Sequence, residues 1–244
     1  MLYQRLSSFA LVTVVVTLIT LPRASQAASF DSLDLLDQGD FEILVENLSA
    51  ATQYRGITPT EPLGLIGFDV GVSLTATEIN DDILDLASDG DFDLGSILVP
   101  KLHVHKGLPF GFDVGAFASA IPETDVLLFG VEGRYAIFDG SAVTPAVGVR
   151  AAYSTIKGLD ELALDNFSLD ISISKGVVMF TPYAGLGVVV SQADANDEFG
   201  LDSETVNLER VYVGLNINVG LNVTLEADRT GDFSSFSGKV GIRF

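Results

Sequence analysis

Apolar and polar residues alternate with a period of two through most of the chain after residue 63. In the stretch 66–75, Ile, Phe, Val or Leu occupies the even positions, while Gly, Asp, Ser or Thr occupies the odd ones. This alternation predicts β-strands with one apolar and one polar face. Breaks rich in Gly, Pro and Asp separate the alternating stretches, which predict strands near residues 64–77, 98–106, 111–121, 127–138, 144–155, 166–175, 180–191, 206–218, 221–229 and 234–244.

The last stretch ends the chain on an aromatic residue of its apolar face. Phe236, Val240, Ile242 and Phe244 share one parity there. This ending resembles the C-terminal strand of Gram-negative outer-membrane β-barrels, whose last residue is typically Phe and is read by the barrel assembly machinery. The resemblance implies an all-β fold, a single antiparallel up-and-down transmembrane β-barrel of about ten strands over residues 63–244. It also implies location in the cell outer membrane, with Phe244 as the assembly signal.

A soluble β-sandwich is the alternative for such a pattern, and the connections and aromatic residues favour the barrel. Short and long connections alternate along the chain, as the periplasmic turns and outer loops of such barrels do. Aromatic residues of the apolar face fall at two levels, as expected for two membrane interfaces: near the short turns Phe68, Phe112, Tyr135, Phe180 and Phe244, and near the long loops Phe129, Tyr153, Phe167 and Phe236.

The polar face of the predicted strands carries as many acids as bases. A sandwich core would not tolerate these charges, whereas a barrel lumen can pair them. We predict a lumen charge network of Asp69, Lys101, His103, His105, Asp113, Glu132, Arg134, Arg150, Asp170 and Arg210, joined by Glu226, Asp228, Lys239 and Arg243. Within it we expect Glu132 to pair with one or both of Arg134 and Arg150, forming a layer across the barrel. Three bulky side chains, those of Phe117, Phe138 and Tyr212, are expected to fill much of the remaining lumen.

The N-terminal part of the chain does not alternate. Arg5, the apolar run 9–21 and the small residues before Ala28 are typical of a secretory signal peptide over residues 1–27. Residues 28–62 form a periplasmic or plug segment, in which the apolar spacing within 41–54 predicts a short amphipathic helix. That helix could rest under the barrel, enter its lumen as a plug, or be disordered.

Composition excludes several classes of chemistry. The 244 residues include no cysteine, so neither disulfides nor thiolate sites can form. A formal net charge of −20 opposes nucleic-acid binding, which requires a basic patch. The acids crowd the predicted long loops, where only Lys157 and Arg229 oppose them. They predict a solvated rim or, alternatively, divalent cations that bridge the rim to lipopolysaccharide. The stretch 85–96 fails as a calcium loop because Ala87 and Ser96 stand at ligand positions.

His103 and His105 are the residues closest to a catalytic or metal-binding pattern. Both lie on the polar face of one strand, and an odd hairpin loop would set His105 opposite Asp113. We favour a hydrogen-bond network in the lumen, with no serine near the histidines, and expect no catalytic, cofactor-binding or metal-binding residues. Outer-membrane lipid, lipopolysaccharide and the barrel assembly machinery are the expected partners.

The sequence therefore favours a non-enzymatic outer-membrane barrel, with a structural or interaction role or a narrow pore of low conductance with a charged lumen. An outer-membrane hydrolase is one alternative, which a rim histidine or a serine–histidine contact would favour. Passive transport of small hydrophobic molecules is another, which a kinked strand opening the wall sideways would favour.

Overall fold

The computed structural model describes residues 33–79, 83, 86, 95–121, 126–159 and 161–244. The predicted signal peptide and the acidic residues 81, 82, 85, 89, 91 and 93 lie outside the described residues. The described strands are β1 (Phe68–Glu78), β2 (Ser96–Gly107), β3 (Phe112–Ala120), β4 (Leu127–Phe138), β5 (Ala146–Lys157), β6 (Leu162–Ser174), β7 (Phe180–Ala195), β8 (Glu204–Asn218), β9 (Asn222–Thr230) and β10 (Phe233–Arg243).

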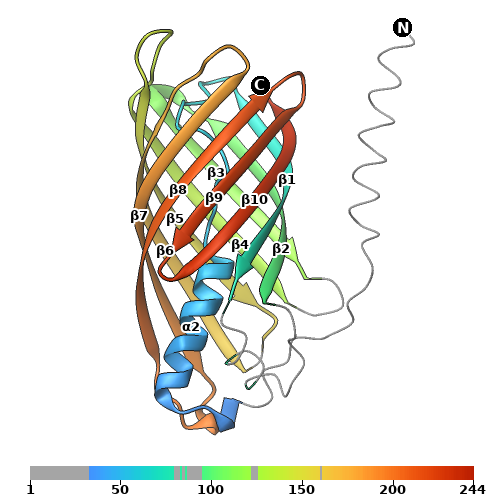
Figure 1. Cartoon of the computed structure of the whole chain (residues 1–244), viewed down its shortest axis with the longest axis vertical. Helices are drawn as coiled ribbons and strands as arrows, with labels where there is room; N and C mark the ends of the chain where they lie inside the picture. Colours follow the sequence, from blue (N-terminus) through green and yellow to red (C-terminus); the bar gives the residue numbers. More distant parts are fainter. Residues whose placement is uncertain (1–32, 80–82, 84–85, 87–94, 122–125, 160) are drawn as a thin grey trace, which may run out of the picture.

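These ten strands form a closed antiparallel barrel (Figure 1). Each strand pairs with its neighbours in sequence, and β10 closes the sheet on β1 from the pair Asp69 and Arg243 to the pair Thr77 and Ser235. Closure gives every strand a neighbour on each side, as a β-structure in a bilayer requires because lipid cannot hydrogen-bond free backbone groups. The predicted up-and-down barrel is thus confirmed.

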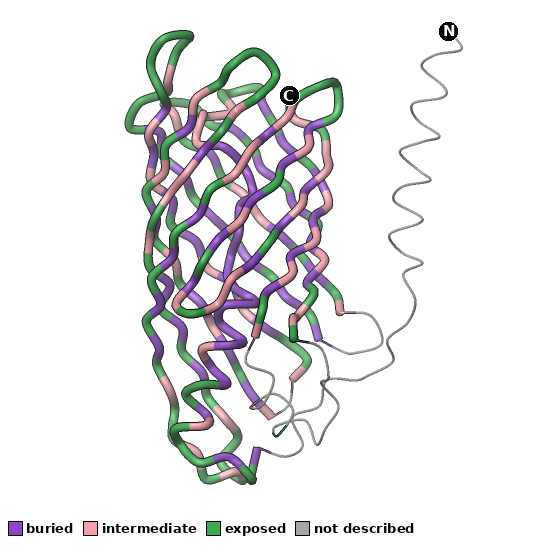
Figure 2. The backbone as a smooth tube through the Cα atoms, in the orientation of Figure 1, coloured by how far each residue is buried: buried purple, intermediate pink, exposed green. Residues whose placement is uncertain are grey.

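Burial alternates along the strands as the sequence pattern predicts (Figure 2). In β4, for example, Leu128, Glu132 and Arg134 are buried while Phe129 and Val131 are exposed. Large apolar side chains cover the outside of the barrel, and charged ones line the inside. This is the inverse of a soluble protein and is the arrangement of a membrane-spanning barrel.

Aromatic residues pack in pairs near the two ends of the outer face. The rings of Phe68 and Phe244 lie 5.9 Å apart at the end that carries the short turns. Toward the end that carries the long loops, the rings of Tyr153 and Phe167 lie 4.9 Å apart. Such pairs at both levels suit the two membrane interfaces, where aromatic rings are preferred.

One inward prediction is wrong. The ladder between β4 and β5 shifts register between Ala136 and Phe138. A bulge of this kind reverses which face a side chain occupies. Phe138 is consequently 64% exposed on the outside instead of filling the lumen, whereas Phe117 and Tyr212 are buried inside as predicted.

The wall has one incomplete seam. The β2–β3 ladder runs from the pair Gly107 and Asp113 to the pair Leu102 and Ala118. Beyond Leu102, β2 continues to Ser96 and pairs only with β1 in the described structure. β3 ends at Ala120, and Pro100, which would face Ala120 in the same register, has no N–H to donate to a ladder. The seam therefore ends short of the long-loop end.

Besides the strands and the α-helix described below, the described elements include the 3₁₀ turns η1 (Leu33–Leu35), η2 (Pro109–Gly111) and η3 (Asp197–Phe199). The helix α2 (Gln38–Thr52) confirms the predicted N-terminal helical segment. The carboxylate of Asp37 accepts from the backbone N–H of Asp40, and the carboxylate of Asp40 lies 3.4 Å from the backbone nitrogen of Asp37, which together cap the helix start. None of the described helices is long and apolar enough to cross a bilayer.

Residues 33–67, here called the plug, run through the barrel. Helix α2 lies at the long-loop end, at the bottom of Figure 1, and packs mainly on β7 and β8. The chain then continues inside the lumen, where Tyr54, Arg55 and Ile57 are fully or almost fully buried. It reaches the short-turn end, where Glu61 accepts a hydrogen bond from the backbone N–H of Gly176, and enters β1 at Phe68. The N-terminal segment thus occupies the lumen from end to end.

Candidate functional site

The lumen has two parts of different chemistry. The part next to the long loops is a hydrophobic core, in which the buried face of α2 (Phe41, Leu44, Val45 and Leu48) packs against inward apolar residues of the wall. Those wall residues include Val99, Leu128, Ile156, Leu164, Val189 and Leu208. The part next to the short turns is polar and charged and surrounds the extended plug residues 53–63. The apolar part of the lumen was not predicted from the sequence, because a few inward apolar residues per strand do not disturb the alternation.

Glu132 occupies the centre of a buried charge layer. Its carboxylate lies 3.2 Å from Nε of Arg134 and 3.6 Å from a terminal nitrogen of Arg150. Nε2 of His105 lies 3.3 Å from the same carboxylate. The predicted pairing of Glu132 with both arginines is therefore confirmed. Because these side chains are shielded from water, their mutual attraction is screened less than that of a surface pair.

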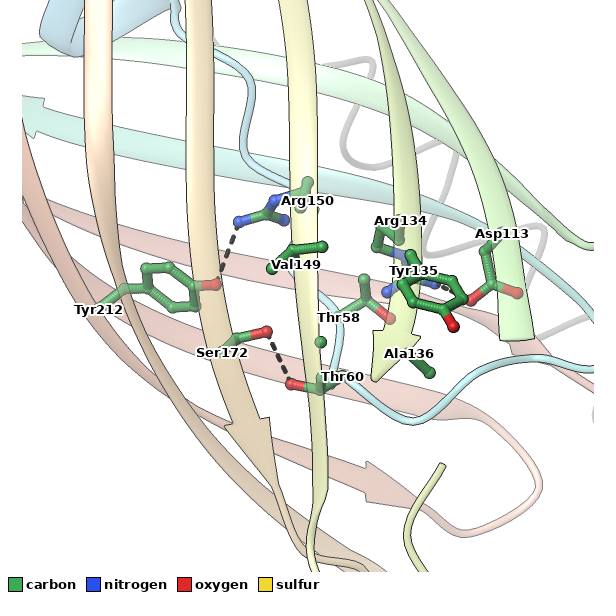
Figure 3. A pocket seen from close by; sticks show the side chains of 11 residues that line it. Thr58, Thr60, Asp113, Arg134, Tyr135, Ala136, Val149, Arg150, Ser172 and Tyr212 are labelled. Carbon is green, nitrogen blue, oxygen red and sulfur yellow. Dashed lines mark hydrogen bonds and ion pairs between the residues drawn. The ribbon is translucent and has the colours of Figure 1, made fainter. Parts of the chain in front are cut away.

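Two further acids complete this layer from the neighbouring strands. The carboxylate of Asp113 on β3 accepts from Arg134 at 2.8 Å, and that of Asp170 on β6 accepts from Arg150 at 2.8 Å. The phenol of Tyr212 donates to Asp170 at 2.7 Å and lies beside Arg150 (Figure 3). Each arginine thus has two acidic partners, as buried guanidinium groups require.

A second layer joins the plug to the wall. Nε of Arg55 donates to Asp228 at 2.9 Å, and another nitrogen of Arg55 donates to Ser235 at 2.8 Å. Arg210 pairs with Glu226 at 2.8 Å and lies 3.5 Å from Asp228. Arg55 was not predicted, because an arginine just after a helix carries no signal that it enters a lumen.

Asp69 is the acid of a third cluster, near the short turns. Nζ of Lys239 donates to its carboxylate at 3.1 Å, and Arg243 lies 3.6 Å away. Arg243 also donates to the hydroxyl of Thr58 and to the backbone carbonyl of Glu61. The end of β10 thereby holds the plug where it leaves the lumen.

Lys101 binds the plug rather than a carboxylate. Its Nζ donates to the backbone carbonyl of Gln53 at 3.0 Å and lies 4.4 Å from the ring centroid of Phe117. Within the described residues, Lys101 makes no ion pair within 4.0 Å. A backbone carbonyl and an aromatic face can both stabilise a buried ammonium group.

His105 does not lie opposite Asp113, its predicted cross-strand partner. Gly107, not His105, is the cross-strand partner of Asp113, while His105 faces Gly115. The predicted pairing of His105 with Asp113 is therefore wrong, since the hairpin shifts the register. A Cβ at position 115 would overlap the His105 ring, so the glycine makes room for it.

A serine does contact a histidine, contrary to the sequence analysis. The hydroxyl of Ser73 lies 2.8 Å from Nε2 of His103. Both residues are buried, and Nδ1 of His103 has no hydrogen-bond partner among the described residues. A nucleophile–base pair needs a third group that orients the base and a space for substrate. Nothing described at this pair supplies either, and no group of three or more potential metal-ligating side chains occurs in the described part of the chain.

A small cavity lies beside the charge layer in the polar part of the lumen. Its volume is ≈ 10 Å³, room for about one water molecule. Figure 3 shows Thr58 and Thr60 of the plug between Arg134 on one side and Arg150, Ser172 and Tyr212 on the other. Plug residues thus line this cavity together with residues of the wall.

Comparisons with known proteins add resemblances of low similarity. No protein-family model and no curated protein matches the sequence. The N-terminal β-barrel domain of Pseudomonas aeruginosa OprF is 15% identical over 71% of this chain and 97% of that chain, with a TM-score of 0.35. The KdgM porin in complex with disordered oligogalacturonate is 10% identical over 72% of this chain and 99% of that chain, with a TM-score of 0.38. Neisserial surface protein A is 12% identical over 72% of this chain and 95% of that chain, with a TM-score of 0.30.

At these identities and TM-scores the resemblances carry no argument about function. The barrel itself decides the class. A closed ten-stranded antiparallel sheet with an apolar exterior and a charged interior is the structure of a small outer-membrane β-barrel protein. The chain is an integral barrel of the cell outer membrane.

Proposed function

We propose that this protein is a non-enzymatic barrel with a structural or interaction role at the cell surface, closed to solutes by its own N-terminal plug. The observation that carries the proposal is the attachment of plug residues 52–63 to the wall by hydrogen bonds from eight strands. The wall residues that bind the plug are Lys101, Asp113, Arg134, Ser154, Asn166, Ser172, Ser174, Arg210, Asp228, Thr230, Ser235 and Arg243.

These contacts come from all sides of the barrel. Thr52 accepts from Ser154, Pro59 accepts from Arg134, and the backbone N–H of Leu63 donates to Asp113. A segment held on one side could swing aside and leave a conducting path. A segment held around its whole circumference must break many buried hydrogen bonds before an ion can pass, each at a cost of roughly 1 kcal/mol or more.

Single-channel recording in planar bilayers tests the proposal. The intact, folded protein should show no steady conductance. A stable open level of the native protein would show that ions pass the plug and would favour the narrow pore instead.

A disulfide that fixes the plug separates a closed barrel from a gated one. The hydroxyls of Thr60 and Ser172 are hydrogen-bonded at 2.8 Å, so we would replace both by cysteine in this cysteine-free chain. The oxidised Thr60→Cys/Ser172→Cys variant should show the same absence of steady conductance as the native protein. Brief openings that vanish on oxidation and return on reduction would show that the plug moves as a gate.

Passive transport of small hydrophobic molecules is a second candidate, favoured by the incomplete seam between β2 and β3. The seam lies beside Val99, which belongs to the hydrophobic core around α2. An apolar molecule could leave this part of the lumen sideways, between two strands that do not pair there.

The proline variant Pro100→Val tests this candidate, since it restores a backbone N–H that can extend the ladder. Transport predicts faster transfer of an apolar fluorophore into vesicles that contain the native protein, and slower transfer with Pro100→Val. The matched control is Pro182→Val in β7, where Pro182 pairs with Leu215 of β8 and its carbonyl accepts from the backbone N–H of Lys175 just after β6. Equal transfer by empty vesicles and all three proteins would exclude the transport role.

A further inference from the structure

The direction in which the plug crosses the barrel fixes the side of the membrane on which it begins. Its first described part lies among the long connections. The side-chain nitrogen of Gln38 donates to Glu204 at 2.8 Å and to the carbonyl of Asp202, and its side-chain oxygen accepts from the backbone N–H of Asp202. Leu33 is fully buried in the same core that Phe199 and Leu201 pack against. The segment between β7 and β8, residues 196–203, is thus in direct contact with the start of the plug.

The last part of the plug lies among the short turns. Glu61 accepts from Gly176 in the turn between β6 and β7. Gly67 accepts from the backbone N–H of Gly107 next to the turn between β2 and β3. The backbones of Phe68 and Phe244 exchange two hydrogen bonds of 2.9 Å, so the C-terminus lies at this end as well.

Short turns face the periplasm in outer-membrane barrels, and long loops face the outside. The chain therefore enters β1 from the periplasmic end and has reached that end by passing down through the lumen from the outer end. An N-terminal plug that entered from the periplasm would place its beginning and its connection to β1 at the same end. Here they lie at opposite ends of the barrel (Figure 1).

We propose that the beginning of the plug, at Asp34 and Leu35, is exposed on the outer surface of the cell, and that the barrel's own lumen is its route across the outer membrane. The N-terminal segment is then a surface-presented part of the protein as well as its plug. This inference concerns topology and stands whether or not the barrel conducts.

Cysteine labelling in intact cells tests the proposal, since the native chain has no cysteine. The test variant is Asp34→Cys at an exposed position, with Leu35→Cys, 58% exposed, as a second. Asp232→Cys in the turn between β9 and β10 is the outer control, and Val178→Cys in the turn between β6 and β7 is the periplasmic control. The probe is a membrane-impermeant maleimide, and labelling is scored only on the folded, heat-modifiable form.

The proposal expects Asp34→Cys and Leu35→Cys to react in intact cells to the same extent as Asp232→Cys. Val178→Cys, whose residue is 98% exposed, should react only after the outer membrane has been permeabilised. Labelling of Asp34→Cys and Leu35→Cys only after permeabilisation, together with Val178→Cys, would overturn the proposal and place the start of the plug in the periplasm. Failure of the conductance test would leave this pattern unchanged, so the two proposals can fail separately.

Discussion

Arg134 and Arg150 are direct cross-strand partners on β4 and β5, with both side chains in the lumen. Two like charges placed opposite each other destabilise a sheet unless other charges compensate them. Here three carboxylates do so, with Glu132 between the arginines and Asp113 and Asp170 beyond them. Each arginine therefore has two carboxylate partners, and Glu132 is the partner that they share.

Removing Glu132 should therefore destabilise the barrel strongly. Glu132→Ala leaves Arg134 and Arg150 facing each other with one acid each. Breaking a buried pair from one side costs about 3–5 kcal/mol. Urea unfolding in lipid vesicles, followed by the heat-modifiable gel shift, measures this loss.

The control is Glu198→Ala in η3, which removes an exposed carboxylate in the connection between β7 and β8. It should leave the unfolding midpoint close to native. Similar losses in the two variants would mean that the layer contributes no more than a surface charge.

The strands and their two faces could be predicted because both depend only on residues close together in the sequence. Alternation in a strand depends only on neighbouring residues, and a charge on the apolar face would be exposed to lipid. Glu132, Arg134 and Arg150 could be placed together for the same reason, since a short turn joins β4 to β5. Residues of matching parity on strands joined by a short turn point to the same side and lie close together, even when the predicted register is slightly wrong.

Other parts depend on geometry that local patterns do not contain. The hairpin between β2 and β3 includes Phe110 and Gly111 with positive φ, and its register moved His105 away from Asp113. The bulge before Phe138 turned that ring outward. The path of the plug is a long-range property, because helical spacing in 41–54 says which face is apolar but not which end of the barrel buries it.

Phe244 should determine how fast the barrel assembles. Its ring stacks on Phe68 and its backbone closes the β1–β10 seam at the short-turn end. Deleting Phe244 removes both, so assembly should slow and unfolded chain should accumulate in the periplasm. Pulse–chase labelling with the gel shift as readout measures the rate, and unchanged kinetics would show that the terminal ring is incidental.

Charges on the outer face near mid-strand should be costly. Val149 and Ile171 are cross-strand partners that point to the lipid. Arg at either position should cost roughly 2–4 kcal/mol at the bilayer midplane. Ser172→Ala, one residue away but inward, removes a hydrogen bond to Thr60 and should cost about 1 kcal/mol. Comparable losses for Ile171→Arg and Ser172→Ala in the same unfolding assay would show that the two faces are assigned wrongly.

Acid should strengthen the docking of helix α2 through Glu46. Burial, then the neighbouring Glu42 and Asp232, raise the pKa of Glu46 above its ordinary value of 4.5. The folded state therefore binds this proton more tightly than the unfolded chain. The penalty for the charged form is present in full above the folded pKa and is relieved as the pH falls through it. At pH 7, the α2 amides should exchange hydrogen more slowly in Glu46→Gln than in the native protein. This difference should shrink on acidification, and a constant difference would contradict the assignment.

The attachment of the plug can be tested with two arginines that differ in burial. Arg55 and Asp228 form an ion pair with both side chains fully buried, whereas Arg229 and Asp232 form a surface pair with side chains 61% and 95% exposed. Arg55→Ala leaves Asp228 with Arg210 alone, so it should lower stability by about 3–5 kcal/mol. Arg229→Ala should change stability by at most about 1 kcal/mol, because water screens its pair.

The same variants relate plug attachment to conductance. With Arg55 removed, the lumen loses one positive charge and the plug loses its bonds to Asp228 and Ser235. Planar-bilayer recordings of Arg55→Ala should then show openings that prefer cations, while Arg229→Ala and the native protein stay closed. If Arg55→Ala folds, loses stability as expected and still does not open, the block lies at the Glu132 layer. The double variant Arg55→Ala/Glu132→Ala should then conduct.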